Sequence, residues 1–520
     1  MAAIITDQLR ILNAKNFVAG VQSSSNSYYT FIGVPNATDY LSTWDTTPPS
    51  PIDNIEEVNN KYWDTMLALK KVAPSDVSQV VTKRTWSSGT TYDMWRNDIS
   101  RNNASQPSGV FDIYDANYYV MNSDYRVYVC LFNNATPENN FQGGPSLDEP
   151  TFTDIEPRAA GSSGDGYIWK YLYTIKPNQI IKFDSTNYIA VPTDWDTNTS
   201  YQSVRENAGS SGQLKIVTIR NRGVGIGTAN VTYTRVPILG DGRGAEATVV
   251  INNDSKVESV TVSRGGEGYS FGTLDLERGG VPNGTIAPVF DIIIPPNGGH
   301  GADIYRELGA YNVLSYARFE NDTQNPDFIT GNQFAQVGIV KNPKNYNSTT
   351  NLTIDKASAV YALKLVGTGY SEAKFTADSF VTQTVGLGST AVGRVVSYDQ
   401  QTGILKYWQD RRTAGFNTDG TKNVNPTYGF EQLKFTADPV SGGSVDIIPT
   451  SGNTLTIDQN FTGVSTTINS RTYYLGQDFT KGVSNPESEK YSGDIIYVDN
   501  RPSVTRSAPQ KEDVKVILQF

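Results

Sequence analysis

The chain has a single histidine, and most familiar catalytic or metal chemistry would have to use it. His300 lies in the glycine-rich run Gly298–Gly301. A Ser–His–Asp triad needs that imidazole as its base, but the serine-containing run Gly161–Gly164 lacks the Gly-x-Ser-x-Gly spacing of a nucleophile elbow. One histidine also excludes metal sites built on two or three imidazoles. We therefore interpret His300 as a loop residue without a catalytic role.

Paired carboxylates are the other route to chemistry, because glycoside hydrolases use two acids. The chain has 53 Asp and Glu residues, with close pairs at Asp194 and Asp196 and at Asp112 and Asp115. Acids so near in sequence are more often solvated or bound to turns, and Asp165, between two glycines, is typical of a turn. The sequence therefore predicts no catalytic residue, no cofactor and no metal ligand, while a glycan-cleaving site stays an open alternative.

Charge and cysteine content narrow the function classes further. The net charge is −10, whereas nucleic-acid binding needs clustered Lys and Arg. The pair Arg411–Arg412 directly follows Asp410 and is typical of a solvated turn. The only cysteine, Cys130, lies in the apolar run Tyr128–Phe132, so we expect a buried thiol and no internal disulfide. No run approaches 18 apolar residues and no signal peptide is recognisable. We expect no nucleic-acid partner, no membrane span and synthesis in a cytoplasm.

The composition is typical of a β-rich chain. Apolar residues make up 38% and charged residues 18%, whereas Gly (46) and Tyr (30) are abundant. Tyr, Thr and Val suit strands, and Gly and Asn suit the turns between them. A length of 520 residues exceeds what one core holds. We predict a mainly-β, multi-domain fold: a β-sandwich-like core with a few N-terminal helices and inserted Gly-rich β domains.

Three helices are expected near the N-terminus. The first spans residues 4–19, the second begins at Asp53 with Glu56 as its capping-box partner, and a short third helix begins at Ser75. The first two show side chains at helical spacing. One face of the first helix is formed by Ile5, Leu9, Leu12 and Asn16, and the adjoining face is formed by Ile4, Ile11 and Val18. The face of the second is formed by Ile55, Val58, Tyr62, Met66 and Leu69.

Most of the remaining chain is predicted to form strands. Three runs are dense in aromatic and β-branched residues: Tyr118–Val120, Tyr125–Phe132 and Tyr167–Ile175. A hairpin is expected where two apolar runs flank residues 399–402. At the C-terminus, apolar side chains alternate over residues 514–520, and we expect residues 495–498 to pair with this strand. Asn500–Pro502 would then begin a long connection between the two.

Glycine content rises over residues 206–300 and again over residues 351–480. A weak internal repeat with a spacing of 43 residues aligns Val217–Gly225 with Val260–Gly268, which suits one small β-unit used twice. The glycines lie between predicted strands, with no helix behind them, so turns explain them better than a nucleotide-binding loop.

Several blocks along the chain resemble one family, the gene-eight baseplate wedge proteins of contractile-tailed, T-even-like bacteriophages. The most specific block is Gly164–Trp169, and the longest runs from Tyr491 to Phe520. Blocks in the same order add to the resemblance: Tyr29–Gly33, Pro48–Pro51, Trp63–Asp64, Lys71–Ser75, Arg84–Trp86, Tyr128–Leu131, Asn187–Pro192 and Phe334–Pro343. The excess length over this family falls in the two Gly-rich segments, which we interpret as insertions.

The resemblance implies a structural protein of the virion tail baseplate with no catalytic site or cofactor. It implies a homodimer that joins other wedge proteins and helps pass the conformational signal that triggers sheath contraction. The implied division is 1–205 as the wedge-family core, 206–300 as a Gly-rich insertion, 301–350 as core, 351–480 as a second insertion, and 481–520 as strands completing the core. A receptor-binding, glycan-binding or depolymerase tail protein is the alternative, with the insertions as a place for host-surface glycan.

The resemblance also indicates which side chains matter for structure. We expect five aromatic residues to form the structural core: Trp169, Tyr167, Tyr171, Trp86 and Trp63. Aromatic side chains bury much apolar surface, so their loss is costly. Arg501, in the predicted connection near the C-terminus, is our candidate for a contact with a partner protein, although a solvated turn is the better explanation from the sequence alone.

Overall fold

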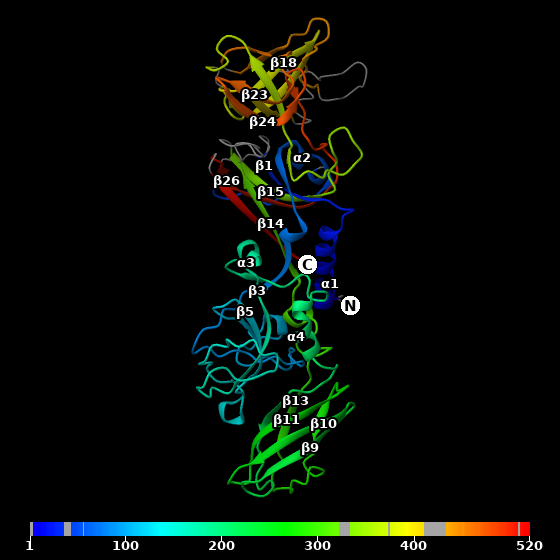
Figure 1. Ribbon diagram of the computed structural model, residues 1–520, viewed down its shortest axis with the longest axis vertical. Coiled ribbons are helices and arrows are strands. Elements are labelled where there is room, and N and C mark those ends of the chain that lie inside the picture. The colour runs from blue at the N-terminus through cyan, green and yellow to red at the C-terminus, as the bar shows by residue number, and fades with distance from the viewer. Residues whose placement is uncertain are drawn as a thin grey trace. The chain divides into compact units, whose positions relative to one another are not determined.

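The computed structural model describes residues 4–35, 43–55, 57–321, 333–372, 375–409, 433–450, 452–507 and 510–520. The prediction of a mainly-β, multi-domain chain is confirmed (Figure 1). The chain forms two compact units. Unit 1 comprises residues 1–18, 78–314 and 517–520, and unit 2 comprises residues 19–77 and 315–516. The division into five segments stays a prediction, and Glu56 and Arg411–Arg412 lie outside the described residues.

The first predicted helix is present as α1, Asp7–Gln22. Its buried positions are Ile11, Ala14, Val18 and Val21, so Ile11 and Val18 of the second predicted face are in the core, whereas Leu9 and Leu12 of the first predicted face are exposed. The remaining helices of unit 1 are short: α3 Pro177–Phe183, α4 Gln202–Asn207 and α5 Ile304–Leu308, with 3-10 turns at Ile113–Asp115, Pro137–Asn139 and Thr199–Tyr201.

An antiparallel sheet of three strands forms the aromatic centre of unit 1. Its strands are β4 Tyr119–Met121, β5 Arg126–Asn133 and β6 Tyr167–Thr174. All three were predicted. Trp169 and Tyr167 of β6 are fully buried and stack with ring centroids 5.4 Å apart, and Tyr92 meets both rings edge-on. Cys130 of β5 is fully buried, and this burial raises the pKa of its thiol well above the usual value, so the prediction of a structural thiol is confirmed.

The third predicted helix was wrong, because residues 77–82 form a strand. Pro74–Asp76 is a single 3-10 turn, and β3, Val77–Thr82, follows it and pairs antiparallel with β7, Tyr188–Ala190. Five consecutive residues of β3 are buried. A strand covered on both faces loses the alternation of apolar and polar residues, so its short apolar run cannot be told from a helix by spacing.

Strands β8–β13, within residues 216–293, form another part of unit 1 (Figure 1, green). One sheet has the order β11-β10-β9-β12 and the other pairs β13 with β8. Both sheets pack on one cluster that includes Val217, Val249 and Val257, with Val260 and Val262 against it. The two copies of the predicted repeat therefore belong to one β-unit, not to two. The strands are β8 Ile216–Asn221, β9 Thr232–Gly240, β10 Arg243–Ile251, β11 Val257–Glu267, β12 Gly272–Leu274 and β13 Val289–Ile293.

The central sheet of unit 2 has the order β16-β2-β1-β15-β26, and all its pairs are antiparallel. Three of its neighbouring strands carry blocks of the family resemblance that are far apart in sequence: β1, β15 and β26. The strands are β1 Tyr28–Gly33, β2 Met66–Lys71, β15 Gln333–Lys341, β16 Lys356–Ser358 and β26 Asp494–Thr505.

The second predicted helix was wrong beyond its first turns. Only a π-turn at Glu57–Lys61 and α2, Tyr62–Asp64, are helical, and Met66–Leu69 belong to the fully buried start of β2. The residue that caps the N-terminus of this helical segment is Asn54, whose side-chain carbonyl oxygen accepts a hydrogen bond from the Glu57 amide at 2.8 Å. Met66–Leu69 of β2 are consecutively buried, so both faces of this part of the strand are covered, and its continuous apolar run mimics helical spacing.

Two predictions for the C-terminal region were also wrong. β26 continues through Asn500–Pro502 to Thr505, and it pairs with β15 rather than with the C-terminal strand. Because β26 is at the edge of its sheet, Pro502 removes no ladder bond to a further strand. The C-terminal strand β27, Lys511–Gln519, is a neighbour of β14, Asn312–Glu320. Asp513 of β27 accepts hydrogen bonds from Tyr316 and Arg318 of β14.

Residues 361–484 form a barrel in unit 2. The strand order β20-β19-β18-β21-β22-β17-β25 closes through pairing of β17 with β20. The predicted hairpin is confirmed, since β19 and β20 pair antiparallel across residues 400–403. A separate hairpin joins β23 and β24. The strands are β17 Tyr361–Val366, β18 Phe380–Gly386, β19 Ser389–Asp399, β20 Ile404–Trp408, β21 Asp446–Pro449, β22 Leu455–Ile457, β23 Gly463–Ile468, β24 Arg471–Phe479 and β25 Val483–Ser484.

Replacing Trp169 by Ala should destabilise the protein by about 3–5 kcal/mol, because the lost ring leaves a cavity that its neighbours cannot fill. Trp86 is the matched control: its side chain is half-buried and its indole donates to the Ser146 hydroxyl at 3.0 Å. Urea unfolding followed by circular dichroism measures both variants. Equal losses for Trp169→Ala and Trp86→Ala would remove the case for Trp169 as a core residue.

Gly338 of β15 should not tolerate alanine. An added Cβ would lie 2.2 Å from the Phe31 ring of β1 and 2.4 Å from the Tyr497 carbonyl oxygen of β26. We expect Gly338→Ala to lower the free energy of unfolding by about 1–3 kcal/mol, the usual range for overpacking. The same measurement on Gly144→Ala, where the nearest atom is 3.4 Å away, is the control. Phe31→Leu combined with Gly338→Ala should recover part of the loss.

Candidate functional site

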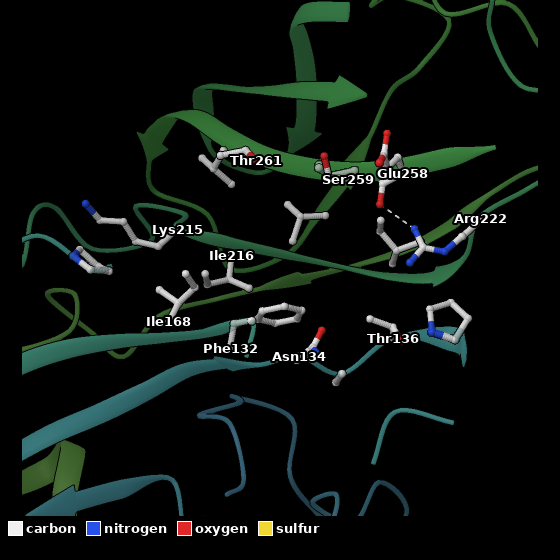
Figure 2. Close-up of a pocket in the computed structure, with 18 of the residues that line it drawn as sticks. Phe132, Asn134, Thr136, Ile168, Lys215, Ile216, Arg222, Glu258, Ser259 and Thr261 are labelled. Atoms are coloured by element: carbon white, nitrogen blue, oxygen red, sulfur yellow. Dashed lines mark hydrogen bonds between the residues drawn. The ribbon is translucent and has the colours of Figure 1, made fainter. Parts of the chain in front are cut away.

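A cleft of about 640 Å³ in unit 1 is a candidate site. It lies between the ends of β5 and β6 on one side and strands β8 and β11 on the other (Figure 2). Phe132, Ile168 and Ile216 point toward one another and form an apolar floor, while Ser259 and Thr261 of β11 line the opposite side.

Strands β8 and β11 face each other at this cleft but are hydrogen-bonded only at its ends. The Leu214 amide donates to the Gly265 carbonyl oxygen at 2.9 Å, and the Val257 amide donates to the Arg222 carbonyl oxygen at 3.0 Å. Both bonds fit one antiparallel register. Between them, β8 pairs only with β13 and β11 only with β10, so the two strands belong to different sheets. The cleft therefore opens at a seam where two strand edges are parted.

Charged side chains close both ends of the cleft. At one end, the Arg222 guanidinium pairs with Glu138 and donates to the Val257 and Glu258 carbonyl oxygens at 2.8 and 2.6 Å. This hydrogen bonding holds the pKa of the Glu138 carboxyl down at about 2. At the other end, the Lys215 ammonium is 3.7 Å from the Glu156 carboxylate. Apolar walls, strand edges and compensated charges suit an extended polypeptide segment, which strand edges bind through main-chain hydrogen bonds.

His300 is buried in a polar cluster beside the β4-β5-β6 sheet. Its Nδ1 is 2.7 Å from a carboxylate oxygen of Glu307, whose other oxygen accepts from the Gly301 amide at 2.7 Å. The imidazole edge meets the Trp95 ring at 4.9 Å. Both His300 and Glu307 are at most 5% exposed. The imidazole thus ties a glycine-rich loop to α5, as expected of a structural loop residue.

Lys170 of β6 belongs to the same buried region. Its ammonium donates to the Ile155 carbonyl oxygen at 2.8 Å and to the Asn207 side chain at 2.7 Å, and the residue is 1% exposed. Burial lowers the pKa of this ammonium to about 8, although the Glu307 carboxylate partly opposes the shift. The burial of Lys170 could not be predicted from the sequence, because the other residues of its strand are mostly aromatic and aliphatic.

Three of the four paired carboxylates considered from the sequence, Asp194, Asp196 and Asp112, have structural partners of their own. Asp196 pairs with Lys15 at 2.8 Å, whereas Asp194 accepts from the Asn198 side chain at 2.7 Å. Asp112 caps a 3-10 turn by accepting from the Tyr114 amide at 2.9 Å. Asp165 accepts from the Leu147 and Tyr167 amides at 2.8 and 3.0 Å, which confirms its role in a turn.

One motif was missed in reading the sequence. Gly268–Gly272 has the Gly-x-Ser-x-Gly spacing of a nucleophile elbow around Ser270. The structure places it between β11 and β12, in a strand-to-strand connection rather than at the strand-to-helix turn that an elbow needs. Ser270 is exposed, and its hydroxyl hydrogen-bonds to Asp241, as does its amide at 2.9 Å. These bonds hold the pKa of Asp241 at about 2.

The predicted core and contact residues lie in different surroundings. Trp169, Tyr167 and Trp63 are fully buried, whereas Tyr171 and Trp86 are half-buried. Arg501 lies on strand β26 of unit 2, not in a turn. Its guanidinium is exposed and pairs with Asp499 at 2.8 Å, and its carbonyl oxygen accepts from the Trp44 indole at 2.8 Å. A partner contact at Arg501 stays a prediction.

Metal binding and membrane crossing can be judged over all the described residues. Within the described ranges, no three His, Cys, Asp or Glu side chains gather closely enough to hold a metal ion. No helix in the described part of the chain is both long enough and apolar enough to cross a membrane.

Comparison with known proteins shows what the N-terminal region of the chain is similar to. Residues 3–206 match the protein-family model described as "Bacteriophage T4, Gp8". The N-terminal two-fifths of this chain is gp8-like. Over 209 residues, the chain is 27% identical to "Baseplate wedge protein gp8" of Enterobacteria phage T4. The aligned region covers 36% of this chain and 60% of that protein. The chain therefore spans about three-fifths of the length of the curated relative that it matches.

The gp8-like region contains α1, the β4-β5-β6 sheet and the block Gly164–Trp169. The resemblance stated from the sequence is confirmed for this region. The later blocks, Phe334–Pro343 and Tyr491–Phe520, lie outside the matched residues, and their resemblance stays a prediction. The cleft lies where the gp8-like sheet meets strands β8 and β11, which follow the matched region in sequence.

Lys170→Met should change the pH dependence of stability. Because burial lowers the pKa of this ammonium from 10.5 to about 8, the unfolded chain binds more protons between these values, and the contribution of Lys170 to stability rises with pH there. The free energy of unfolding of the parent minus that of Lys170→Met should therefore rise from pH 8 toward pH 10.5, by up to about 3 kcal/mol. Urea unfolding at several pH values measures it. A constant difference would contradict the burial of a charged Lys170.

Proposed function

We propose that this chain is a structural subunit of a bacteriophage tail baseplate wedge. The similarity of residues 3–206 to baseplate wedge protein gp8 of phage T4 carries this proposal. The role is association rather than catalysis, in the tail baseplate of the virion, after assembly in the host cytoplasm. We further propose that the chain forms a homodimer, joins neighbouring wedge proteins and helps transmit the conformational change that triggers sheath contraction.

The geometry of unit 1 supports a role in association. Obligate interfaces bury roughly 2,000 Å² or more and need a rigid surface to pack against. The aromatic β4-β5-β6 sheet, with Trp169 and Tyr167 fully buried, gives unit 1 a well-packed centre. The cleft at the seam of β8 and β11 offers an apolar floor and free strand edges, the features by which an extended segment of a neighbour is held.

Light scattering on the purified chain, alone and mixed with the neighbouring wedge proteins of the same genome, tests the proposal. We expect a dimer that enters a larger complex of fixed stoichiometry. A stable trimer that ignores those proteins but binds host-surface glycan would instead support the receptor-binding or depolymerase alternative.

A variant of the cleft tests its part in assembly. Ile216→Glu places a charge on the apolar floor, so it should weaken the complex with neighbours while circular dichroism shows the β structure retained. Ile181→Glu, at an exposed position of α3 outside the cleft, is the matched control. If the two variants assemble equally well, the cleft is not a contact, and the wedge proposal then rests on the assembly experiment alone.

A further inference from the structure

The buried Lys170 ammonium lies against a side-chain amide, and that amide lies against a carboxylate. Nζ of Lys170 donates to the Asn207 side-chain oxygen at 2.7 Å and to the Ile155 carbonyl oxygen at 2.8 Å. Nδ2 of Asn207 donates to a carboxylate oxygen of Glu156 at 2.6 Å. An amine, a carboxamide and an acid in a row are the nucleophile, the electrophile and the proton carrier that amide exchange between side chains needs.

The orientation of the Asn207 carboxamide follows from its two partners. An ammonium can only donate hydrogen bonds, and a carboxylate can only accept them. The oxygen of Asn207 therefore faces Lys170, and its nitrogen faces Glu156. This orientation places the amine beside the carbonyl group and the acid beside the nitrogen that departs.

We propose that the side chains of Lys170 and Asn207 become joined by an isopeptide bond, with Glu156 as the residue that transfers the proton to the departing nitrogen. The inference goes beyond the proposed function and does not depend on it, because it concerns the covalent structure of unit 1. The bond joins β6 to the end of α4 and closes the loop of residues between them.

Lys170 has the properties of a nucleophile. Desolvation lowers the pKa of its ammonium to about 8, so a larger share of the amine is neutral near pH 7 than in an exposed lysine. The residue is 1% exposed, which keeps bulk water away from the amine. The carbon that it attacks lies one C=O bond, about 1.23 Å, beyond the oxygen that Nζ already contacts.

The fold holds the two reacting side chains together. Asn207 is the last residue of α4, and the amide of the next residue, Ala208, donates to the Val204 carbonyl oxygen at 3.1 Å. Both Val204 and Ala208 are at most 4% exposed. On the other side, Ile155 holds Nζ through its carbonyl oxygen, and the adjacent residue holds Nδ2. Groups held in this way react as if at very high concentration.

The reaction balances without any further reagent. The Nζ lone pair forms a bond to Cγ of Asn207, and both nitrogens are then attached to that carbon. Glu156, which contacts Nδ2, takes a proton from Nζ and passes it to Nδ2. The Cγ–Nδ2 bond breaks and ammonia leaves. The ammonium of Lys170 loses two protons in all: one leaves within ammonia, and the other goes to solvent, where it converts ammonia to ammonium.

The reaction removes a charge from the interior. A buried ammonium is costly even when it is hydrogen-bonded, whereas the secondary amide that replaces it is neutral and can still donate to Ile155. The side chain of Glu156 is 67% exposed, so the released ammonia has a path to solvent. The pH-dependent stability predicted above for Lys170 belongs to the chain before this reaction, because an amide nitrogen does not titrate.

A similar pair in unit 2 provides an internal comparison. The Lys344 ammonium donates to the Asn351 side-chain oxygen at 2.6 Å, but the nitrogen of that carboxamide donates to the Ser25 carbonyl oxygen at 3.4 Å. A backbone carbonyl cannot pass a proton to a departing nitrogen. We therefore expect the bond at Lys170 and not at Lys344.

Mass spectrometry of the purified full chain tests the proposal. The intact mass should be lower than the sequence mass by one ammonia, not by two. A tryptic digest should contain a branched peptide that joins the segments with Lys170 and Asn207. Asn283 and Asn297 each precede glycine, where a cyclic imide would cause the same loss of mass. The branched peptide is therefore the deciding result.

Three variants assign the roles. Lys170→Arg and Asn207→Ala should keep the full sequence mass. Glu156→Gln should form the bond at least about 100-fold more slowly, the usual effect of losing a general acid–base group. Glu206→Gln is the matched control, because Glu206 precedes Asn207 but hydrogen-bonds to Gln202 at 2.7 Å, and this variant should form the bond at the parent rate. Circular dichroism checks that the variants keep the fold.

Each outcome decides one point. A parent chain that keeps its full sequence mass and yields no branched peptide after long incubation overturns the bond. Equal rates for Glu156→Gln and the parent overturn the role of Glu156. Neither result bears on the wedge function, which fails only if the chain enters no complex with neighbouring baseplate proteins.

Discussion

The pairing of β1 with β15 is the contact on which the arrangement of unit 2 depends. It joins Tyr28–Gly33 to Gln336–Lys341, so a loop of about 300 residues must close for it to form, and such closure is entropically unfavourable. The only cysteine, Cys130, is buried in unit 1, so no disulfide holds the loop. Burial holds it instead: all six residues of β1 are buried, and the Phe31 ring lies over Gly338, where no side chain larger than hydrogen fits.

The barrel of unit 2 and the two packed sheets of unit 1, β11-β10-β9-β12 and β13-β8, differ in how their edge strands are paired. In unit 2, pairing of β17 with β20 completes a continuous ring of strands. In unit 1, β8 and β11 meet only through one backbone bond at each end of their seam, and Arg222 reinforces one of these ends by contacting both β11 and Glu138. The parted middle is where the cleft opens. A closed barrel presents no free strand edge, whereas the two sheets of unit 1 leave the edges of β8 and β11 unpaired along the cleft, next to the gp8-like sheet.

Strands dense in aromatic and β-branched residues were predictable from the sequence. β4, β5, β6 and the β19–β20 hairpin lie where these residues predict them, because local composition and turn residues carry that information. The helices predicted over β2 and β3 failed for one physical reason: strands covered on both faces have continuous apolar runs, which short windows cannot distinguish from helices.

The candidate site could be predicted only in part. The buried thiol of Cys130 and the turn role of Asp165 follow from their neighbours in sequence, and the structure agrees with both, but neither residue lines the cleft. His300 was expected only to be a loop residue, and its contact with Glu307 could not be predicted. The cleft could not be predicted, because it depends on two strands that stay apart despite facing each other. The partner of β26 is likewise set by tertiary packing, since nothing in Asp494–Thr505 itself distinguishes β15 from β27 as a neighbour.

The division into units affects how the chain can fold during its synthesis on the ribosome. The chain passes from one unit to the other four times, after Val18, Val77, Leu314 and Val516, so neither unit is a continuous stretch of sequence. Unit 1 receives its final piece, Ile517–Phe520, only after nearly all of unit 2 has been made. Domains usually fold one after another during translation. Here the last residues of the two units are adjacent in sequence, at Val516 and Ile517–Phe520, so a nascent chain carries two incomplete cores until both units are almost complete.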